Sequence, residues 1–316
     1  MKRRAFVSLA PGLALASMTA FAQPRVAVVG VLDPGDSPEF VSDLRKTLAG
    51  LGHVEGKTLR LEIRSGHNGA ADLARGAEEL ARLRVDVIAV RLTPALRAAM
   101  QATLEIPIVM AAVGAPVETG LVASLSRPGG NVTGMSLGGV TLAAKRLQII
   151  REVVPTVRRL ASLVNSHEPY SEIVAATFEQ AGKPLGLQTV SIRTTAETLD
   201  AGLAQLERER PDAIHTLASL PVEPIITAAL RLRAPLFATQ RSAVEAGALM
   251  SYGGRLDEQF EGAALYVDKI LKGAKPANLP VEEPSRFELF INLRTARALG
   301  ITIPRTLLAQ ADTLIE

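Results

Sequence analysis

Short apolar runs alternate with longer segments of helical periodicity along most of the chain. The run 25–31 is almost wholly apolar after its first residue, which is typical of a strand buried on both faces of a parallel sheet. Segment 39–51 has the apolar spacing of an amphipathic helix and is followed by Gly52, a common helix stop. A strand pattern at 59–64 and a helix pattern at 70–83 repeat this order. We therefore predict βαβ units in an open, mostly parallel sheet with helices on both faces.

The same succession continues and then repeats in the second half. A strand at 85–90 precedes a helix that we expect to begin at Pro94, and another strand follows at 106–110. Four segments of the second half match four of the first in the same order: 159–165 matches 25–31, 189–193 matches 59–64, 212–215 matches 86–89, and 234–237 matches 106–109. Any α/β chain is somewhat self-similar, but the paired X-Pro-apolar strands favour two lobes of one architecture.

Three short strand patterns at 132–136, 247–253 and 285–292 separate the two halves, and we interpret them as crossings between the lobes. Three crossings would form a hinge that bends without separating, placed near residues 136, 251 and 287. The predicted fold class is α/β, with two doubly wound lobes of similar topology joined by a three-strand hinge. The predicted domains are a signal peptide at 1–22, an N-terminal lobe at 23–135 plus 252–286, and a C-terminal lobe at 136–251 plus 287–316.

The first residues have the pattern of a cleaved secretory signal. Lys2, Arg3 and Arg4 precede an uncharged stretch that ends in Ala-Phe-Ala at 20–22. A membrane anchor is the alternative, but the stretch 5–20 contains Pro11-Gly12 and is shorter than the roughly 20 residues a span requires. The arginine pair leaves Sec and Tat export both open. We expect a periplasmic protein.

Charge and composition narrow the function classes. The chain has 35 basic and 32 acidic residues, and loss of the signal would leave equal numbers, so we expect no nucleic-acid partner. There is no cysteine, which excludes thiolate zinc sites and a lipoprotein anchor. The four histidines lack ligand spacing, so we expect neither a metal nor a cofactor. Aromatic residues make up only 3% and there is no tryptophan, which argues against sugars as ligands.

Long stretches of the sequence resemble one family of transport proteins. They are TGLVASLSRPGGNVTG at 119–134, VEAGALMSYG at 244–253, YVDKILKGAKP at 266–276, PVEEPSRFELFINLRTARALG at 280–300 and LGHVEG at 51–56. These stretches are similar to ABC transporter substrate-binding proteins of the tryptophan-binding TrpX type, and the resemblance covers the whole chain. It implies a type I periplasmic binding fold in a non-enzymatic, monomeric protein. It further implies delivery of a small molecule to a membrane permease with a cytoplasmic ATPase.

Ligands of open α/β sheets bind beyond the carboxyl ends of the strands, which selects particular loops in each lobe. The candidate ligand-binding residues are Asp33, Pro34, Gly35, Arg91, Leu92, Thr93, Pro94, Val113 and Gly114 in the first lobe, Asn165, Tyr170, Ser219, Gln240 and Arg241 in the second, and Ser136 at the first crossing.

Some of these residues have specific candidate roles. Arg91 and Arg241 could each receive a ligand carboxylate, with a surface ion pair as the alternative. Asp33 could hold a ligand amine or simply stabilise a turn. Thr93 could contact the ligand or cap its own helix.

One difference from the family affects the expected ligand. Many relatives have Asp-Pro where this chain has Ala115-Pro116, so a carboxylate that could bind an amine is missing there. We therefore expect an amino acid or a small carboxylate, captured by the periplasmic solute-binding component of an ABC importer.

Two other functions are compatible with parts of the sequence. A ligand-sensing protein that serves a membrane receptor would have the same fold. An esterase is favoured only by Gly134-Met-Ser136-Leu-Gly138, which matches a nucleophile elbow, with Asp212 and His215 following in the right order. The elbow requires a helix directly after the serine, whereas Gly138-Gly139 interrupts the sequence there.

Overall fold

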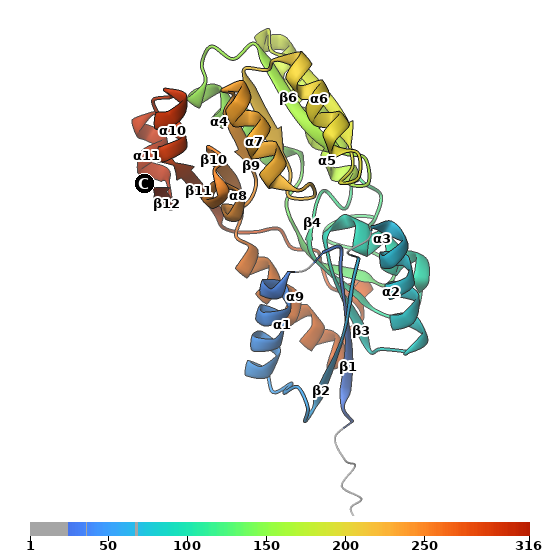
Figure 1. Cartoon of the computed structure of the whole chain (residues 1–316). Helices are drawn as coiled ribbons and strands as arrows, with labels where there is room; N and C mark the ends of the chain where they lie inside the picture. Colours follow the sequence, from blue (N-terminus) through green and yellow to red (C-terminus); the bar gives the residue numbers. More distant parts are fainter. Residues whose placement is uncertain (1–24, 36, 67–68) are drawn as a thin grey trace, which may run out of the picture.

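The computed structural model describes residues 25–35, 37–66 and 69–316. The predicted signal peptide at 1–22 lies outside these residues. The described chain forms two bodies stacked end to end, each built on one sheet (Figure 1). No helix in the described chain is long and apolar enough to span a bilayer.

The first body contains a five-stranded parallel sheet in the order β2-β1-β3-β4-β5. Its strands are β1 (Ala27–Asp33), β2 (Leu59–Ser65), β3 (Val87–Arg91), β4 (Ile108–Val113) and β5 (Val132–Ser136). Its helices are α1 (Pro38–Gly50), α2 (Ala70–Arg82), α3 (Leu92–Ala102) and α9 (Leu256–Leu271).

Strand periodicity places the core of this body on both faces of the sheet. Successive side chains of a strand point to opposite faces, so Val87 and Ala89 of β3 pack with α1 and α9, whereas Ile88 and Val90 pack with α2 and α3. Figure 1 shows α9 beside α1, although the two helices lie far apart in the sequence.

The second body contains a seven-stranded sheet in the order β12-β11-β10-β9-β8-β6-β7. Its strands are β6 (Arg159–Asn165), β7 (Gln188–Thr194), β8 (Ala213–Thr216), β9 (Leu236–Ala238), β10 (Met250–Gly254), β11 (Phe287–Asn292) and β12 (Thr313–Ile315). Its α-helices are α4 (Val140–Val153), α5 (Pro169–Gly182), α6 (Leu199–Glu209), α7 (Val222–Leu232), α8 (Arg241–Ala246), α10 (Leu293–Leu299) and α11 (Arg305–Gln310). The second body also contains a short 3₁₀ turn, η1 (Lys183–Leu185), and another such turn, η2 (Pro276–Asn278), contacts β5 of the first body. The order 7-6-8-9-10 repeats the order 2-1-3-4-5 of the first sheet, and among the described strands only β10 and β11 pair antiparallel.

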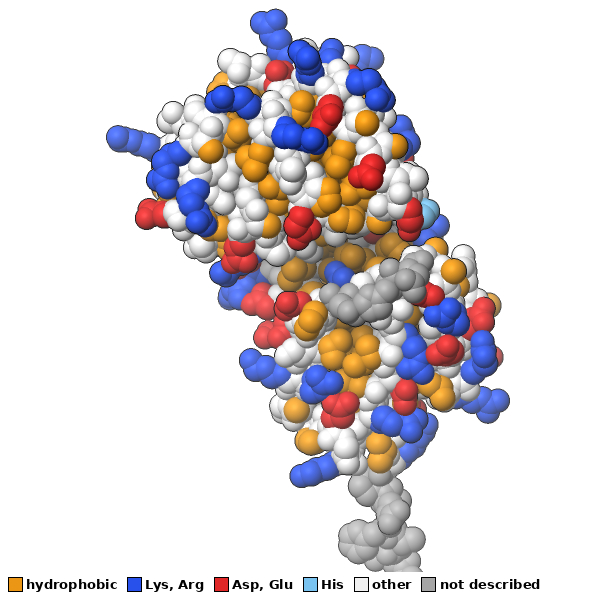
Figure 2. Space-filling model, viewed as in Figure 1, with side chains coloured by type: hydrophobic (Ala, Val, Ile, Leu, Met, Phe, Trp, Pro, Cys, Tyr) orange, Lys and Arg blue, Asp and Glu red, His pale blue; other side chains and the backbone are white. Residues whose placement is uncertain are grey.

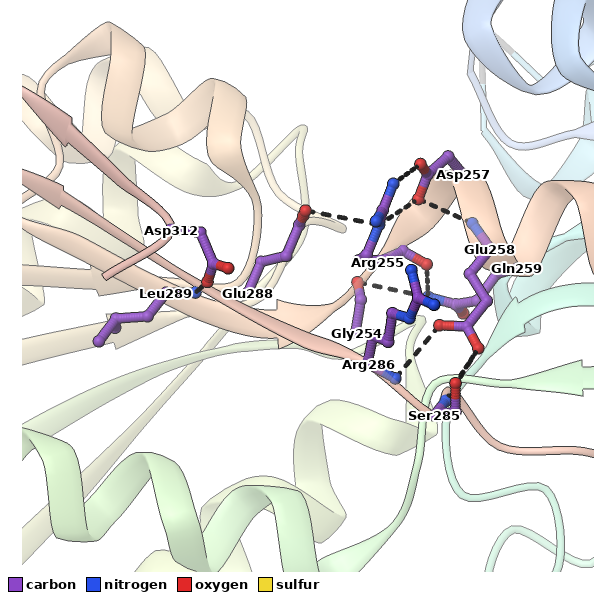
Figure 3. Close-up of polar contacts among 10 residues, drawn as sticks. All are labelled: Gly254, Arg255, Asp257, Glu258, Gln259, Ser285, Arg286, Glu288, Leu289 and Asp312. Carbon is purple, nitrogen blue, oxygen red and sulfur yellow. Dashed lines mark hydrogen bonds and ion pairs between the residues drawn. The ribbon is translucent and has the colours of Figure 1, made fainter. Parts of the chain in front are cut away.

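The chain passes between the two sheets three times, and the three passing segments are joined to one another. The Ser136 N–H donates to Glu282 O at 2.8 Å, and the Arg255 N–H donates to Arg286 O at 3.1 Å. Glu258 of α9 accepts from the Ser285 N–H at 3.1 Å, the Ser285 hydroxyl at 2.6 Å and the Arg286 N–H at 3.2 Å (Figure 3). One carboxylate therefore ties the start of α9 to the segment that returns to β11.

The start of α3 differs from the prediction. The helix begins at Leu92, with Arg91 as its N-cap residue, so Pro94 occupies the third helical position rather than the first. Thr93 lies inside the helix and its hydroxyl makes no capping bond, so the proposal that it caps its own helix is wrong. Leu92 has a positive φ of 62°, and this left-handed turn lets the helix start directly from the end of β3.

Candidate functional site

Two adjoining cavities lie between the bodies. The outer cleft has a volume of about 600 Å³ and is lined from the first body by residues of the 34–35 loop, α2 and α3, and from the second body by residues in 165–167, 196–197 and 218–221. The inner pocket measures about 40 Å³ and is lined by residues that include Arg146, Glu168, Tyr170 and Gly114. Arg91, Leu92, Ala218 and Ser219 line both, so the cavities adjoin each other. Figure 2 shows hydrophobic side chains gathered at the waist between the bodies.

The cavities lie where the carboxyl ends of parallel strands from both sheets face each other. β3 ends at Arg91 and β6 ends at Asn165, and both residues line the outer cleft. The inner pocket is also bordered by Leu92 and Ala112, two non-glycine residues with positive φ, 62° and 55°. Strained backbone of this kind is concentrated at binding sites, where the surrounding fold holds it in place.

Arg91 and Asp33 bind each other. β1 and β3 are neighbours in the sheet, so their last residues lie side by side. Arg91 Nε lies 3.0 and 2.9 Å from the two Asp33 carboxylate oxygens, and Arg91 Nη2 lies 2.7 Å from Oδ1. Asp33 is only 3% exposed and lines neither cavity. Two side chains with separately predicted ligand roles thus neutralise each other, and Arg91 presents the edge of an ion pair to the cavities.

Tyr170 of the second body inserts into a notch at Gly114 of the first. A β-carbon added to Gly114 would lie 2.1 Å from Tyr170 Cγ, so no larger residue fits there without displacement. The Tyr170 side chain is buried and lines the inner pocket. Ala115, which follows Gly114 in the sequence, packs in the same hydrophobic cluster as Tyr170 and supplies no carboxylate. The bodies are therefore in direct contact at the inner end of the cavities.

Arg146 of α4 is a buried cation at the floor of the inner pocket. It is 4% exposed. Its Nε donates to Tyr252 O at 2.9 Å and its Nη1 donates to the Tyr170 hydroxyl at 3.4 Å. No Asp or Glu among the described residues lies within 4.0 Å of its guanidinium nitrogens. The positive charge is therefore held in place by neutral acceptors only.

Glu168 is the buried carboxylate of the same pocket. It is 4% exposed, precedes α5, and accepts from the Tyr170 N–H at 3.3 Å. Burial raises the pKa of this carboxyl above its ordinary value, against the opposing effects of the Thr93 hydroxyl, the Tyr170 N–H and the more distant Arg97. The Thr93 hydroxyl is close enough to affect Glu168, but it makes no hydrogen bond of normal geometry.

The other predicted site residues fall into two groups. The first group lines the cavities: the outer cleft is lined by Pro34, Gly35, Pro94 and Asn165, the inner pocket by Gly114 and Tyr170, and both by Leu92 and Ser219. Gln240 borders the inner pocket and a third cavity of about 330 Å³. Val113, Ser136, Thr93 and Asp33 are buried beside the site without lining it.

Arg241 lines neither of the two main cavities and lies beside the segments that join the bodies. It lines only the third cavity, donates from Nε to Glu245 at 2.6 Å, and sits over the Phe290 ring. These contacts match the alternative expectation for Arg241, that it forms a surface ion pair.

The three candidate esterase residues are not assembled. The Ser136 hydroxyl is buried and accepts from the Gly138 N–H at 3.1 Å. Asp212 accepts from the backbone N–H groups of Arg158 and Arg159, both at 2.8 Å. His215 is buried in the second body with neither ring nitrogen hydrogen-bonded. No group of three His, Cys, Asp or Glu residues suited to a metal ion occurs in the described chain either.

Sequence reasoning missed Arg146 and Glu168. Glu168 lies in the predicted ligand loop 165–170, but its neighbours gave no reason to prefer it. Arg146 carries a detectable signal, because it falls among Ala143, Leu147 and Ile150 on the buried face of α4. A charge on the apolar stripe of a helix indicates a partner inside the protein.

The chain is similar in sequence and in fold to known proteins. The curated tyrosine-binding protein of Clostridioides difficile is 27% identical over 81% of this chain and 75% of its own length. A conserved domain protein from Vibrio cholerae matches with a TM-score of 0.85 and 29% identity over 92% of this chain and all of that one. A Streptococcus pneumoniae ABC domain in complex with L-Trp matches with a TM-score of 0.83 and 25% identity over 92% and 99% of the two chains.

The family model of the ABC transporter substrate binding protein matches residues 25–315. This match covers almost all of the described chain and includes both sheets. The protein belongs to the ABC transporter substrate-binding protein family, and its two doubly wound bodies form the type I periplasmic binding fold.

Proposed function

We propose that this protein is the periplasmic solute-binding component of an ABC importer and that it captures an amino acid or a related small carboxylate between its two bodies. The observation that carries the proposal is the pair of adjoining cavities between the carboxyl ends of both sheets. Two of the similar proteins bind L-Trp or tyrosine, as their names state, which favours an amino acid. The outer cleft of about 600 Å³ lies within the usual range of small-molecule sites.

In this proposal, closure of the two bodies accompanies capture. The lobes are residues 23–135 plus 252–286 and residues 136–251 plus 287–316, and the segments near 136, 251 and 287 bend between them. An open form admits the ligand, the ligand contacts both lobes, and the closed form docks on a membrane permease whose ATPase is cytoplasmic. The protein acts as a monomer that is exported by a cleaved signal at 1–22. It makes and breaks no bond.

Native mass spectrometry of freshly purified protein, followed by a thermal-shift panel, tests the proposal. We expect a co-purified small molecule in the mass range of amino acids, or a melting-temperature increase with at least one of the 20 amino acids. A ligand at 100 times its Kd stabilises the folded protein by roughly 2.7 kcal/mol. If no amino acid or small carboxylate moves the melting curve and no such molecule co-purifies, the proposed ligand class is wrong.

A further inference from the structure

The inner pocket contains two buried charges of opposite sign that do not pair with each other. Arg146 contributes a guanidinium and Glu168 a carboxylate, and both residues line the pocket. No ion pair within 4.0 Å joins them or connects either one to another side chain of the described chain. Burying an ionised group without a partner is costly, so charges arranged in this way are expected to find partners in whatever fills the cavity.

Tyr170 fixes the spacing of the two charges. Its backbone N–H donates to Glu168 and its hydroxyl accepts from Arg146 Nη1, so the charges lie at opposite ends of one residue. The Tyr170 ring is held in the notch at Gly114. The anion-binding and cation-binding ends of the pocket are therefore positioned by a side chain that has little freedom to move.

Arg146 retains unused donor capacity. A guanidinium has five N–H donors in a planar fork, which suits a carboxylate in a bidentate arrangement. The bonds to Tyr252 O and the Tyr170 hydroxyl use Nε and Nη1. Nη2 has no hydrogen-bond partner among the described residues, and it lies close to Gly253, which also lines the pocket.

We infer that the inner pocket binds the zwitterionic head group of an α-amino acid, with Arg146 receiving the α-carboxylate and Glu168 receiving the α-ammonium group. This inference rests on the proposed function, and it assigns recognition of the amino acid's charged groups to two residues. Glu168 is the single acidic side chain among the described residues that line the pocket, and it takes the role that Ala115 cannot fill. A ligand with only one charge would leave the opposite buried charge without a partner.

The outer cleft then receives the side chain of the ligand. The inner pocket of about 40 Å³ has room for a charged head group and little more, and it adjoins the outer cleft of about 600 Å³. The outer cleft has apolar wall segments at Leu73, Leu92 and Leu220, and it is also lined by Arg97, His167 and Glu197. From the volume of the outer cleft we expect a side chain of medium to large size.

Isothermal titration with three matched probes tests this assignment. L-tyrosine has both charges, tyramine lacks the carboxylate, and 3-(4-hydroxyphenyl)propanoate lacks the amine. Wild-type protein should bind L-tyrosine at least 100-fold more tightly than either analogue, because each analogue strands one buried charge. If an amino acid other than tyrosine is bound best, its own amine and acid analogues replace these two.

Two substitutions separate the roles of the charges. Arg146→Gln should weaken binding of L-tyrosine at least 30-fold and leave tyramine unchanged, whereas Glu168→Gln should weaken L-tyrosine similarly and leave the propanoate unchanged. Lys145→Gln, next to Arg146 on α4, and Glu172→Gln, in the first turn of α5, are the matched controls and should bind like wild type. Melting curves without ligand establish that each variant folds.

The outcomes are distinguishable. If Arg146→Gln binds L-tyrosine as tightly as wild type does, or if wild type binds tyramine as tightly as L-tyrosine, the assignment is overturned while amino-acid capture stands. If wild type binds none of the 20 amino acids, the proposed function fails and this assignment fails with it. If Arg146→Gln does not fold, the wild-type preference among the three probes decides the question.

Discussion

The guanidinium of Arg91 holds both carboxylate oxygens of Asp33 at the adjoining ends of β3 and β1. Both side chains are largely removed from solvent, at 14% and 4% exposure. The pair therefore has a structural role at the site. Arg91 is the N-cap residue of α3 and lines both cavities, so its ion pair with Asp33 holds the start of α3 beside them.

Arg91→Ala should destabilise the protein strongly. The substitution leaves the buried Asp33 carboxylate with the Gly35 N–H as a donor but without its cationic partner, and breaking a buried pair in this way costs about 3–5 kcal/mol of the free energy of unfolding. Urea denaturation followed by circular dichroism measures the loss. Arg82→Ala, which breaks the exposed pair of Arg82 with Glu78, is the control and should cost about 1 kcal/mol or less. Equal losses for the two variants would show that Asp33 does not depend on Arg91.

Gly114→Ala should weaken ligand binding by about tenfold or more. A β-carbon at Gly114 would overlap the Tyr170 ring, and relieving such overpacking costs about 1–3 kcal/mol, of which each 1.4 kcal/mol is a factor of ten in Kd. Titration calorimetry gives the affinity, and small-angle X-ray scattering should show a wider separation of the bodies. Gly50→Ala, at the end of α1 and outside both cavities, is the control, because a β-carbon there meets nothing within 4 Å. Unchanged affinity for Gly114→Ala would mean that Tyr170 moves freely.

His215 should make the protein sensitive to acid. Burial keeps the pKa of His215 well below its ordinary value of 6.5, with a smaller contribution from the Arg146 charge. Below about pH 6.5 the unfolded chain takes up a proton that the folded protein resists, so the free energy of unfolding falls as the pH drops.

The variant His215→Leu removes this term and should lose less stability than wild type on acidification. The stability difference between the two proteins should grow by at most about 1.4 kcal/mol per pH unit below that point, measured by urea denaturation between pH 7.5 and 5. At pH 7.5 the variant should be about as stable as wild type, since it also removes two buried nitrogens without partners. A pH-independent difference would contradict the prediction.

Glu258→Ala should loosen the connection between the two bodies. The Glu258 carboxylate accepts three hydrogen bonds from Ser285 and Arg286 (Figure 3). Partial burial raises the pKa of this carboxyl, but the hydrogen bonds together lower it by more, so the pKa lies below its usual value. Amide hydrogen exchange at Ser285 and Arg286 should accelerate in the variant, because their N–H groups lose an acceptor. Glu261→Ala, an exposed position on the same helix, should leave both rates unchanged.

The local pattern of the chain was sufficient to predict its architecture. Apolar runs predicted most strands, and β5 and β6 begin and end where the pattern placed them. This works because a strand buried on both faces must be apolar throughout, and a helix on its surface must repeat its apolar positions every three or four residues. The rule that ligands bind at strand carboxyl ends likewise selected loops that line the cavities, including Gly114, Asn165 and Ser219.

Tertiary structure alone decided which side chains in those loops remain available. The sequence could not show that Arg91 and Asp33 bind each other, because this depends on β1 and β3 being adjacent in the sheet. It could not show that Arg146 and Glu168 share one pocket, because α4 and the start of α5 meet only after the second body folds. Whether two charges pair depends on the distance between side chains from segments far apart in the sequence. Hydrophobic periodicity, in contrast, is visible within each short segment of the sequence. The sequence by itself therefore determined the two-bodied scaffold, and only the folded structure determined which charged side chains pair with one another.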